Sequence, residues 1–348
     1  MRVSRTGPAD ESALLNLARN GDERAFGELA GGYQPELRAH CYRMLGSLHD
    51  AEDAVQEAML RSWRSIAGFE GRGSIRSWLY AIATNAALDA ARHRSRRELP
   101  VDFGPSAARG SELDGPLAEM HWIEPFPDQW LAPAAGHSPE ARYELRESVE
   151  LAFVVALQHL PPLQRAVLLL REVAGFSIDE IAGQLGTSAA SANSALQRAR
   201  AAARKRLPER SQQIALRRLG DERIRALVTR YADALEGGDA DTLVGMLTED
   251  ATWSMPPIPT WFRGRPAIRE FLVRYPLQER WMHVPARANG QIAVGCYLPD
   301  PAGGAFVPAV IDVLTMDGDK ISSVTGFLTG SKLFARFGLS AELPGTPA

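Results

Sequence analysis

Apolar side chains recur at helical spacing over most of the first 97 residues of the chain. The longest stripe contains Phe26, Leu29, Tyr33, Leu37, Cys41, Met44 and Leu45. Gly46-Ser47 and the loop 69–74, which carries two closely spaced glycines, interrupt the pattern. Asp22 and Ser74 stand where they can cap the helices that follow. The pattern predicts a nearly all-helical block from Glu11 to Arg97.

A second helical block begins at Pro139 and ends in a predicted helix-turn-helix. Ser177 and Glu180 have the spacing of a capping box, and Gly186 permits a tight turn. Thr187 or Ser188 then caps the second helix, whose buried side contains Ala192, Leu196, Ala199 and Ala203. Its opposite side contains Asn193, Ser194, Gln197, Arg200 and Arg204. Such side chains suit a helix that lies in the major groove of DNA, and the alternative is a helical hairpin with a solvated basic face.

The segment between the two helical blocks, residues 98–138, is rich in proline and glycine and has no regular period. It nevertheless carries Trp122, Phe126 and Trp130, and disordered linkers seldom contain so many aromatic side chains. We therefore expect this linker to pack on the protein itself, with docking on a partner as the alternative.

The pattern changes after Pro208, where strand-like runs follow the helices. Helical spacing from Ile224 to Leu235 ends at Gly237-Gly238, and Asp239 can cap a short helix before a strand at 251–255. The prolines at 256–259 break that strand, and residues 264–273 are again helical. Four more strands are expected at 284–288, 291–298, 306–316 and 320–328, the last two joined by an Asp317-Gly318 turn. This order predicts an α+β unit with a curled antiparallel sheet.

Charge is local rather than global. The 348 residues suffice for two or three domains, and the net charge of -3 gives no overall nucleic-acid signature. Basic side chains form two clusters, Arg92, His93, Arg94, Arg96 and Arg97, and Arg198, Arg200, Arg204, Lys205 and Arg206. Because each cluster ends a helical block, the pair fits a phosphate-binding surface better than two solvated helix ends.

No apolar run approaches the ~18 residues of a membrane span, and the polar N-terminus has no signal segment. Cys41 and Cys296 have no partner spacing for a zinc site. We therefore expect a reduced cytoplasmic protein with no metal and no cofactor.

Two stretches of the helical blocks resemble bacterial RNA polymerase sigma factors of the extracytoplasmic-function (ECF) group. Asp50–Glu57 and Ser77–Asn85 resemble region 2 of that group, and Phe176–Ala182 with Gln197–Arg200 resembles region 4. The C-terminal part resembles the SnoaL-like cone fold through Glu236–Asp239, Asp250–Trp253 and Phe262–Ile268.

The resemblance implies two all-α sigma domains, a region 2 helical bundle and a region 4 helix-turn-helix, plus an α+β SnoaL-like domain. The expected bounds are 10–97 for region 2, 98–138 for the linker, 139–207 for region 4 and 219–338 for the SnoaL-like domain. It also implies a protein that binds core polymerase, recognises the minus-ten and minus-thirty-five promoter elements and initiates transcription.

The resemblance carries specific roles to this chain. The residues expected to dock on the polymerase clamp helices are Asp50, Glu52, Asp53, Gln56 and Glu57. Those expected at the minus-ten element are Phe69, Ser74, Asn85, Asp89 and Arg92, with Arg94, Arg96 and Arg97 on phosphates. Those expected at the minus-thirty-five element are Ser188, Asn193, Ser194, Gln197, Arg198 and Arg200. Because Asn193 and Ala195 stand where the family often has basic residues, region 4 is expected to bind DNA weakly alone.

The C-terminal domain is expected to regulate the sigma activity and to have no catalytic role. Its candidate pocket is lined by Trp253, Met255, Trp261, Phe262, Phe271, His283 and Phe327. His283, Asp250 and Asp312 are the acid–base candidates, but their spacing forms no dyad or triad. The alternative is a DNA-binding regulator fused to a small-molecule-binding or isomerase/hydrolase-type domain. A pocket in which His283 and Asp312 converge would favour that alternative, and a collapsed pocket would favour a regulatory module.

Overall fold

The computed structural model describes residues 8–71, 73–92, 95–117, 121–131, 144–208 and 210–345. The chain divides into two compact units. The first combines Met1–Arg97 with Trp130–Leu207, and the second combines Glu98–Gln129 with Pro208–Ala348. Arg72, His93, Arg94 and the linker residues 118–120 and 132–138 lie outside the described residues.

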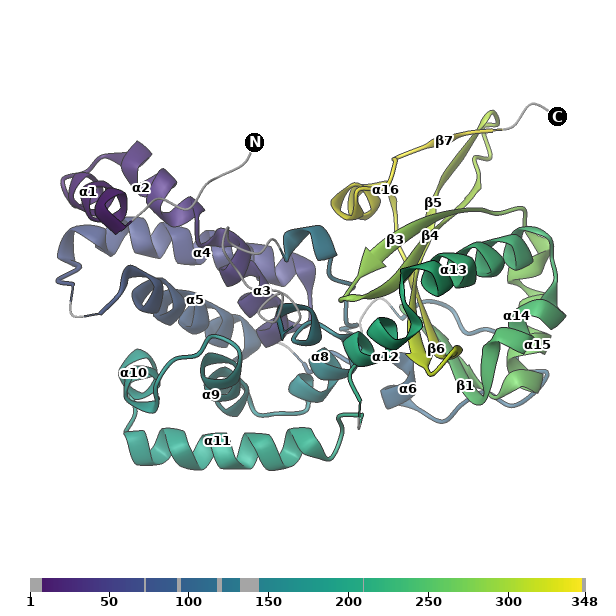
Figure 1. The fold of residues 1–348 in the computed structure, drawn as a ribbon, viewed down its shortest axis with the longest axis horizontal. Helices are drawn as coiled ribbons and strands as arrows, with labels where there is room; N and C mark the ends of the chain where they lie inside the picture. Colours follow the sequence, from purple (N-terminus) through teal and green to yellow (C-terminus); the bar gives the residue numbers. More distant parts are fainter. Residues whose placement is uncertain are drawn as a thin grey trace. The chain divides into compact units, whose positions relative to one another are not determined.

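The regular elements described in the first unit are helices (Figure 1), as the sequence predicts. Its N-terminal block contains α1 (Pro8–Arg19), α2 (Glu23–Gly31), α3 (Gln34–Leu45), α4 (Leu48–Ser65), the 3-10 turn η1 (Ile66–Gly68) and α5 (Ile75–Arg92). Its C-terminal block contains α8 (Leu151–Gln158), α9 (Pro162–Glu172), α10 (Ile178–Gln184) and α11 (Ala189–Arg204).

Local capping chemistry sets where several of these helices begin. Asp22 accepts a hydrogen bond from the Ala25 N–H at 3.0 Å, and Ser74 accepts one from the Ser77 N–H at 3.1 Å. At the helix-turn-helix, Ser177 and Glu180 form the complete capping box and Ser188 caps α11. The predicted caps are therefore confirmed, and Ser188 rather than Thr187 is the cap of α11.

The second unit is built on one mixed sheet. Its strands are β1 (Leu247–Met255), β2 (Ile258–Arg263), β3 (Met282–Ala288), β4 (Gln291–Pro299), β5 (Ala305–Asp317), β6 (Lys320–Leu328) and β7 (Leu343–Pro344). Their order is β2-β1-β6-β5-β4-β3, with β7 paired to β5. Because β1 and β6 are parallel, the prediction of an antiparallel sheet is wrong at this one pair. After β2 the chain passes through α15 and enters the sheet again at β3. The antiparallel meander β3–β6 then ends with β6 beside β1 and parallel to it.

The prolines at 256–259 do not end the sheet. Pro256 and Pro257 form the turn of a hairpin, and β2 then pairs antiparallel with β1. Pro259 lies inside β2, which is tolerable because β2 is an edge strand whose outer N–H groups need no partner strand. The sequence pattern does not predict β2, because two adjacent prolines usually end a strand.

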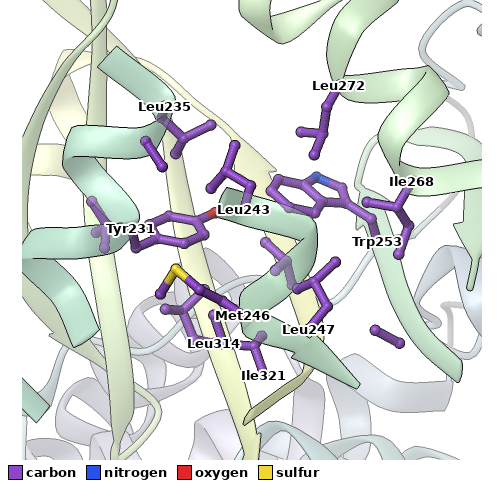
Figure 2. Close-up of a cluster of buried hydrophobic side chains, with 14 of the residues drawn as sticks. Tyr231, Leu235, Leu243, Met246, Leu247, Trp253, Ile268, Leu272, Leu314 and Ile321 are labelled. Atoms are coloured by element: carbon purple, nitrogen blue, oxygen red, sulfur yellow. The ribbon is translucent and has the colours of Figure 1, made fainter. Parts of the chain in front are cut away.

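Helices cover one face of this sheet. They are α12 (Gln212–Leu219), α13 (Asp221–Glu236), α14 (Ala240–Met246) and α15 (Arg265–Arg274). Short elements complete the unit: α6 (Pro100–Phe103), η2 (Asp128–Trp130), η3 (Pro276–Gln278), α16 (Ser331–Phe334) and η4 (Ala335–Phe337). Figure 2 shows Leu272 of α15 directed toward Trp253 of β1, with Tyr231 of α13, Leu314 of β5 and Ile321 of β6 in the same cluster. This buried cluster fills the interior of the cone.

Candidate nucleic-acid interface and C-terminal site

The acidic residues expected to face the polymerase lie on two sides of α4. The exposed side contains Asp53, Gln56 and Glu57, with Glu52 half-buried beside them. Asp50 is buried at the start of the helix, where its carboxylate accepts a hydrogen bond from Arg97 at 2.6 Å. Its charge is thus already paired within the first unit.

The loop that precedes α5 is anchored by an aromatic contact. Phe69 is buried, and its ring centroid lies 5.2 Å from that of the half-buried Trp78. Ser74 is exposed and occupied as the cap of α5. The loop therefore has a fixed base, formed by Phe69 and Trp78, beside an exposed rim.

Along α5 the expected minus-ten residues share one exposed side. Asn85 is exposed, and Asp89 lies one turn further along the helix. Asp89 accepts hydrogen bonds from Arg61 at 3.0 Å and from Arg92 at 3.2 Å. The Asn85 carboxamide is therefore free to meet a ligand directly, whereas Asp89 is held by two guanidinium groups. Of the arginines expected on phosphates, Arg96 is exposed and Arg97 is bound to Asp50.

The helix-turn-helix presents the predicted outward face. Exposed side chains on α11 include Asn193, Ser194, Gln197 and Arg198. Arg200 forms an ion pair with Glu172 of α9, and Ser188 is the helix cap. Four polar side chains of α11 are thus available to a groove, while Ser188 and Arg200 also hold the motif together.

The aromatic candidates for the C-terminal pocket divide between the two faces of the sheet. Trp253, Phe262 and Phe271 pack together in the buried cluster, and the ring centroids of Phe262 and Phe271 lie 4.7 Å apart. Met255 is partly buried against them. A Cβ at Gly326 would meet Asp312 on the inner face, so the adjacent Phe327 points to the outer face.

The acid–base candidates have separate partners. His283 Nδ1 lies 3.1 Å from Glu236 Oε1, and burial lowers the pKa of His283 although Glu236 opposes this effect. Asp312 Oδ2 accepts hydrogen bonds from the Tyr231 hydroxyl at 2.8 Å and the Cys296 thiol at 3.5 Å. Asp250 is exposed. His283 and Asp312 therefore belong to two different pairs rather than to one catalytic constellation.

Asp312 is nonetheless in an unusual environment. Burial raises its pKa to about 6, although the hydrogen bonds from Tyr231 and Cys296 act in the opposite direction. The same burial raises the pKa of the Cys296 thiol, which makes it a poor nucleophile. Asp312 is thus a buried acid that accepts hydrogen bonds from Tyr231 and Cys296. Both donors already have an acceptor in the protein, so neither needs a ligand.

A small open hollow lies beside α15. It is lined by Phe262, Phe271 and Tyr275 and by linker residues 108–111, and neither His283 nor Asp312 contributes to it. The linker residues therefore form one wall of this hollow.

Linker residues 98–129, here called the strap, are part of the second unit. The strap first follows the edge strand β2: the Ala107 N–H donates to the Trp261 carbonyl at 2.8 Å, and the Trp261 indole donates to the Gly104 carbonyl at 2.9 Å. The Leu117 N–H then donates to the Pro257 carbonyl at 3.0 Å. The strap thus supplies partners to an edge that would otherwise be open.

The other end of the strap is held at the turn between β3 and β4. The Asn289 N–H donates to the Phe126 carbonyl, and the Phe126 N–H donates to Asn289 Oδ1, both at 2.8 Å. Asp128 accepts a hydrogen bond from the Gly290 N–H at 2.7 Å. Trp122, Ile123 and Phe126 are all buried. The expectation that the linker packs on the protein itself is confirmed for these residues.

Sequence reasoning missed three groups of residues. It gave no role to Arg76, to Tyr231 as the partner of Asp312, or to Asn289. Asn289-Gly290 is an Asn-Gly pair between two predicted strands, which is a recognisable hairpin signal. The contacts of Arg76 and Tyr231 join residues far apart in sequence, so no local pattern announces them.

Among the described residues, no helix combines the length and the apolar composition that a membrane crossing requires.

Three family models match the chain. Sigma-70 region 2 matches residues 29–97, the region 4 model of Sigma-70 matches residues 150–202, and the SnoaL-like domain model matches residues 228–324.

Individual proteins are similar over different lengths. The chain is 42% identical to the ECF RNA polymerase sigma factor SigG of Mycobacterium tuberculosis, over 97% of this chain and 87% of that protein. It is 30% identical to the RNA polymerase sigma-H factor of Pseudomonas aeruginosa, over 57% of this chain and 93% of the relative. The crystal structure of the M. tuberculosis extracytoplasmic function sigma factor SigJ aligns with a TM-score of 0.54 at 23% identity, over 90% of this chain and 99% of that one. The last comparison shows a similar fold over 90% of this chain.

Proposed function

Because the chain belongs to the ECF group of RNA polymerase sigma factors, it binds core polymerase and directs initiation at promoters, and we propose that α4, α5 and α11 carry the required contacts. The observation that supports this assignment is the row of exposed polar side chains on α11, in a helix-turn-helix whose caps are complete.

The minus-thirty-five contact is assigned to the exposed face of α11. Asn193 and Gln197 carry carboxamides that can pair with adenine, and Arg198 carries a guanidinium that can pair with guanine. Arg200 forms an ion pair with Glu172, which fixes the position of α11. We therefore assign Arg200 to a DNA phosphate rather than to a base.

The minus-ten contact is assigned to α5 and the loop before it. Asn85 supplies the base-reading carboxamide, and Arg92 supplies a cation beside the phosphate backbone. Phe69 and Ser74 act by shaping the loop, because one is buried and the other caps α5.

The polymerase contact is assigned to the exposed side of α4. Asp53, Gln56 and Glu57 lie on the side that also exposes Leu60, whose exposed fraction is 52%. An acidic surface with one apolar side chain suits a basic helical partner, because charge guides the encounter and the apolar contact adds affinity.

These assignments are tested by transcription in vitro with core polymerase on a promoter library. Asn85→Ala removes the assigned base contact and Asp89→Ala releases Arg61 and Arg92, so both should alter preference at the minus-ten element. Arg198→Ala should relax preference at the minus-thirty-five element. One base contact contributes about 1–3 kcal/mol of discrimination. Arg24→Ala, an exposed arginine on α2, is the matched control. Unchanged preference in all three folded variants would refute the assignment.

The C-terminal unit is proposed to act as a regulator by holding the strap. The strap belongs to the segment that joins the two promoter-binding regions, and a free tether of this kind leaves their separation loosely defined. Binding residues 98–129 to the C-terminal unit removes that freedom over much of the tether. No catalysis is assigned, since His283 and Asp312 have separate partners. We also propose that the protein acts in the cytoplasm, where core polymerase is found.

The regulatory role is tested with two phenylalanines of the strap. Phe126 is fully buried and Phe103 is 46% exposed, so Phe126→Ala should release the strap and Phe103→Ala should not. On promoters whose spacers differ by single base pairs, Phe126→Ala should lower the peak output and broaden the spacing preference. Identical spacing profiles for Phe126→Ala and the wild type would exclude this role. A truncation after Pro208 is a coarser test because it exposes the buried aromatic side chains of the strap.

A further inference from the structure

Arg76 connects the two helical blocks of the first unit. It stands in the first turn of α5, and its Nε donates to Glu36 of α3 at 3.0 Å. Its Nη1 donates to the carbonyl of Ala174, after α9, at 3.0 Å. One guanidinium thus binds a region 2 carboxylate and a region 4 carbonyl at the same time.

Aromatic side chains enclose the same guanidinium. Its carbon lies 4.7 Å from the ring centroid of Tyr80 and 5.0 Å from that of Phe176. The two rings meet edge to face at 5.2 Å. Tyr80 and Phe176 are buried and the Arg76 side chain is 30% exposed, so the cation–π contacts are partly shielded from water and stronger than at a fully exposed site.

Further hydrogen bonds extend this contact. Gln184 of α10 donates to the Ser77 hydroxyl at 2.8 Å. Arg43 of α3 donates to the carbonyl of Ser148, before α8, at 2.9 Å, and Arg165 of α9 donates to the Met44 carbonyl. Arg43 and Arg165 are both buried. Regions 2 and 4 therefore share a desolvated interface, in which Arg76 contacts both sides.

This interface cannot persist while both promoter elements are bound. Elements near minus-ten and minus-thirty-five lie roughly 25 base pairs apart, or about 85 Å along the duplex. Helices of the lengths of α5 and α11 extend only about 27 and 24 Å. Since α5 contacts α10, and α11 follows α10 after a short turn, residues on α5 and α11 are far closer than 85 Å.

We propose that Arg76, Tyr80 and Phe176 form a latch that keeps the free protein closed, and that core polymerase must open it before the promoter is read. Polymerase can shift this equilibrium only by binding the open form more tightly, so latch strength sets part of the cost of forming the active complex. The latch keeps the free protein from occupying promoters without polymerase.

The test measures the separation of the two regions in the full-length protein. Donor and acceptor dyes are placed by Arg64→Cys on α4 and Ala202→Cys on α11, both exposed, while the native Cys41 and Cys296 are buried. Arg76→Ala and, from the other side of the interface, Phe176→Leu are compared with the control Arg24→Ala. Each latch variant should raise the low-transfer population roughly three- to tenfold. The affinity for a promoter fragment without polymerase should rise by the same factor.

Three results would overturn the latch. One is high energy transfer that persists in wild-type protein bound to core polymerase and a two-element promoter. Another is low transfer in the free wild-type protein. The third is unchanged transfer in both latch variants with native circular dichroism. Arg76→Ala also removes the ion pair with Glu36 and could prevent folding for that reason. In that case Phe176→Leu and Gln184→Ala test the latch, since neither alters that ion pair.

Discussion

The carboxylate of Asp50 lies 2.6 Å from the guanidinium of Arg97, and the two side chains are only 8% and 12% exposed. The pair joins the first turn of α4 to the last residue of the N-terminal block, and the negative charge also lies near the positive end of the helix dipole. We therefore expect Asp50 to stabilise the fold of region 2.

We expect Asp50→Asn to destabilise the first unit by about 3 kcal/mol, because it removes the carboxylate that pairs with the largely buried Arg97 guanidinium. Hydrogen exchange of α4 peptides in the full-length protein measures this loss. Asp53→Asn, on the exposed side of the same helix, should change stability by less than about 0.5 kcal/mol. Native exchange in Asp50→Asn together with lost polymerase binding would instead make Asp50 a partner contact.

Helical spacing in the sequence already distinguishes Asp50 from the exposed acidic residues of α4. Asp50 lies four residues before Ala54, which is buried, so both fall on the same side of α4. Asp53 and Glu57 share the other side. Counting acidic residues grouped them together, whereas helical spacing separates them.

The sequence separation of two interacting residues decides whether the sequence pattern predicts their contact. The caps at Ser177 and Ser188 depend on neighbours three residues away, so the pattern alone located them. Strand β2 was missed because its pairing with β1 and its coverage by the strap outweigh the proline that it contains. The contacts of Arg76 depend on residues nearly a hundred positions away, which the sequence order does not reveal.

A buried histidine should make the first unit sensitive to acid. His40 lies 2.9 Å from the Thr84 hydroxyl, and burial, with Arg43 and Arg76 nearby, lowers the pKa of His40 from 6.5 to about 3. The folded state therefore favours neutral His40. The stability that this provides is complete above pH 6.5 and is lost as the pH falls toward 3.

Between pH 7.5 and pH 5 this group should reduce the free energy of unfolding by about 2 kcal/mol. Hydrogen exchange of α3 peptides at the two pH values, corrected for intrinsic rates, measures the loss. His40→Gln should lower stability at pH 7.5 but show a flatter dependence on pH. Equal slopes in wild type and variant would show that His40 does not control it.

Asp312 should have the opposite effect in the second unit. Its pKa is raised from 3.8 to about 6, so the folded state favours the protonated acid. The stability that this provides is complete below pH 3.8, is lost as the pH rises to 6, and changes little above that. Asp312→Asn cannot ionise but keeps an oxygen for the Tyr231 hydroxyl.

The stability of Asp312→Asn relative to the wild type should therefore increase by about 2.4 kcal/mol between pH 4 and pH 7.5. Hydrogen exchange of peptides from β4 and β5 reports it locally. Tyr231→Phe removes a donor and should destabilise the unit more at pH 7.5 than at pH 4. A difference between Asp312→Asn and the wild type that does not change with pH would contradict the raised pKa.

Asn289 should control how firmly the strap is held. It is fully buried, has a φ of 54°, and exchanges two hydrogen bonds with Phe126. Asn289→Gly keeps the left-handed backbone accessible but removes the carboxamide oxygen that accepts the hydrogen bond of the buried Phe126 N–H, at a cost of about 1–3 kcal/mol. Asn289→Ala adds roughly 1 kcal/mol of backbone strain at the turn.

Exchange of strap peptides 121–129 should therefore accelerate in both variants, and exchange of the β3–β4 turn should accelerate more in Asn289→Ala. Asp319→Ala, in the exposed β5–β6 turn, is the control. If strap peptides exchange at the wild-type rate in both variants, Asn289 does not anchor the strap, and the buried aromatic side chains with the Asp128–Gly290 hydrogen bond hold this end of it.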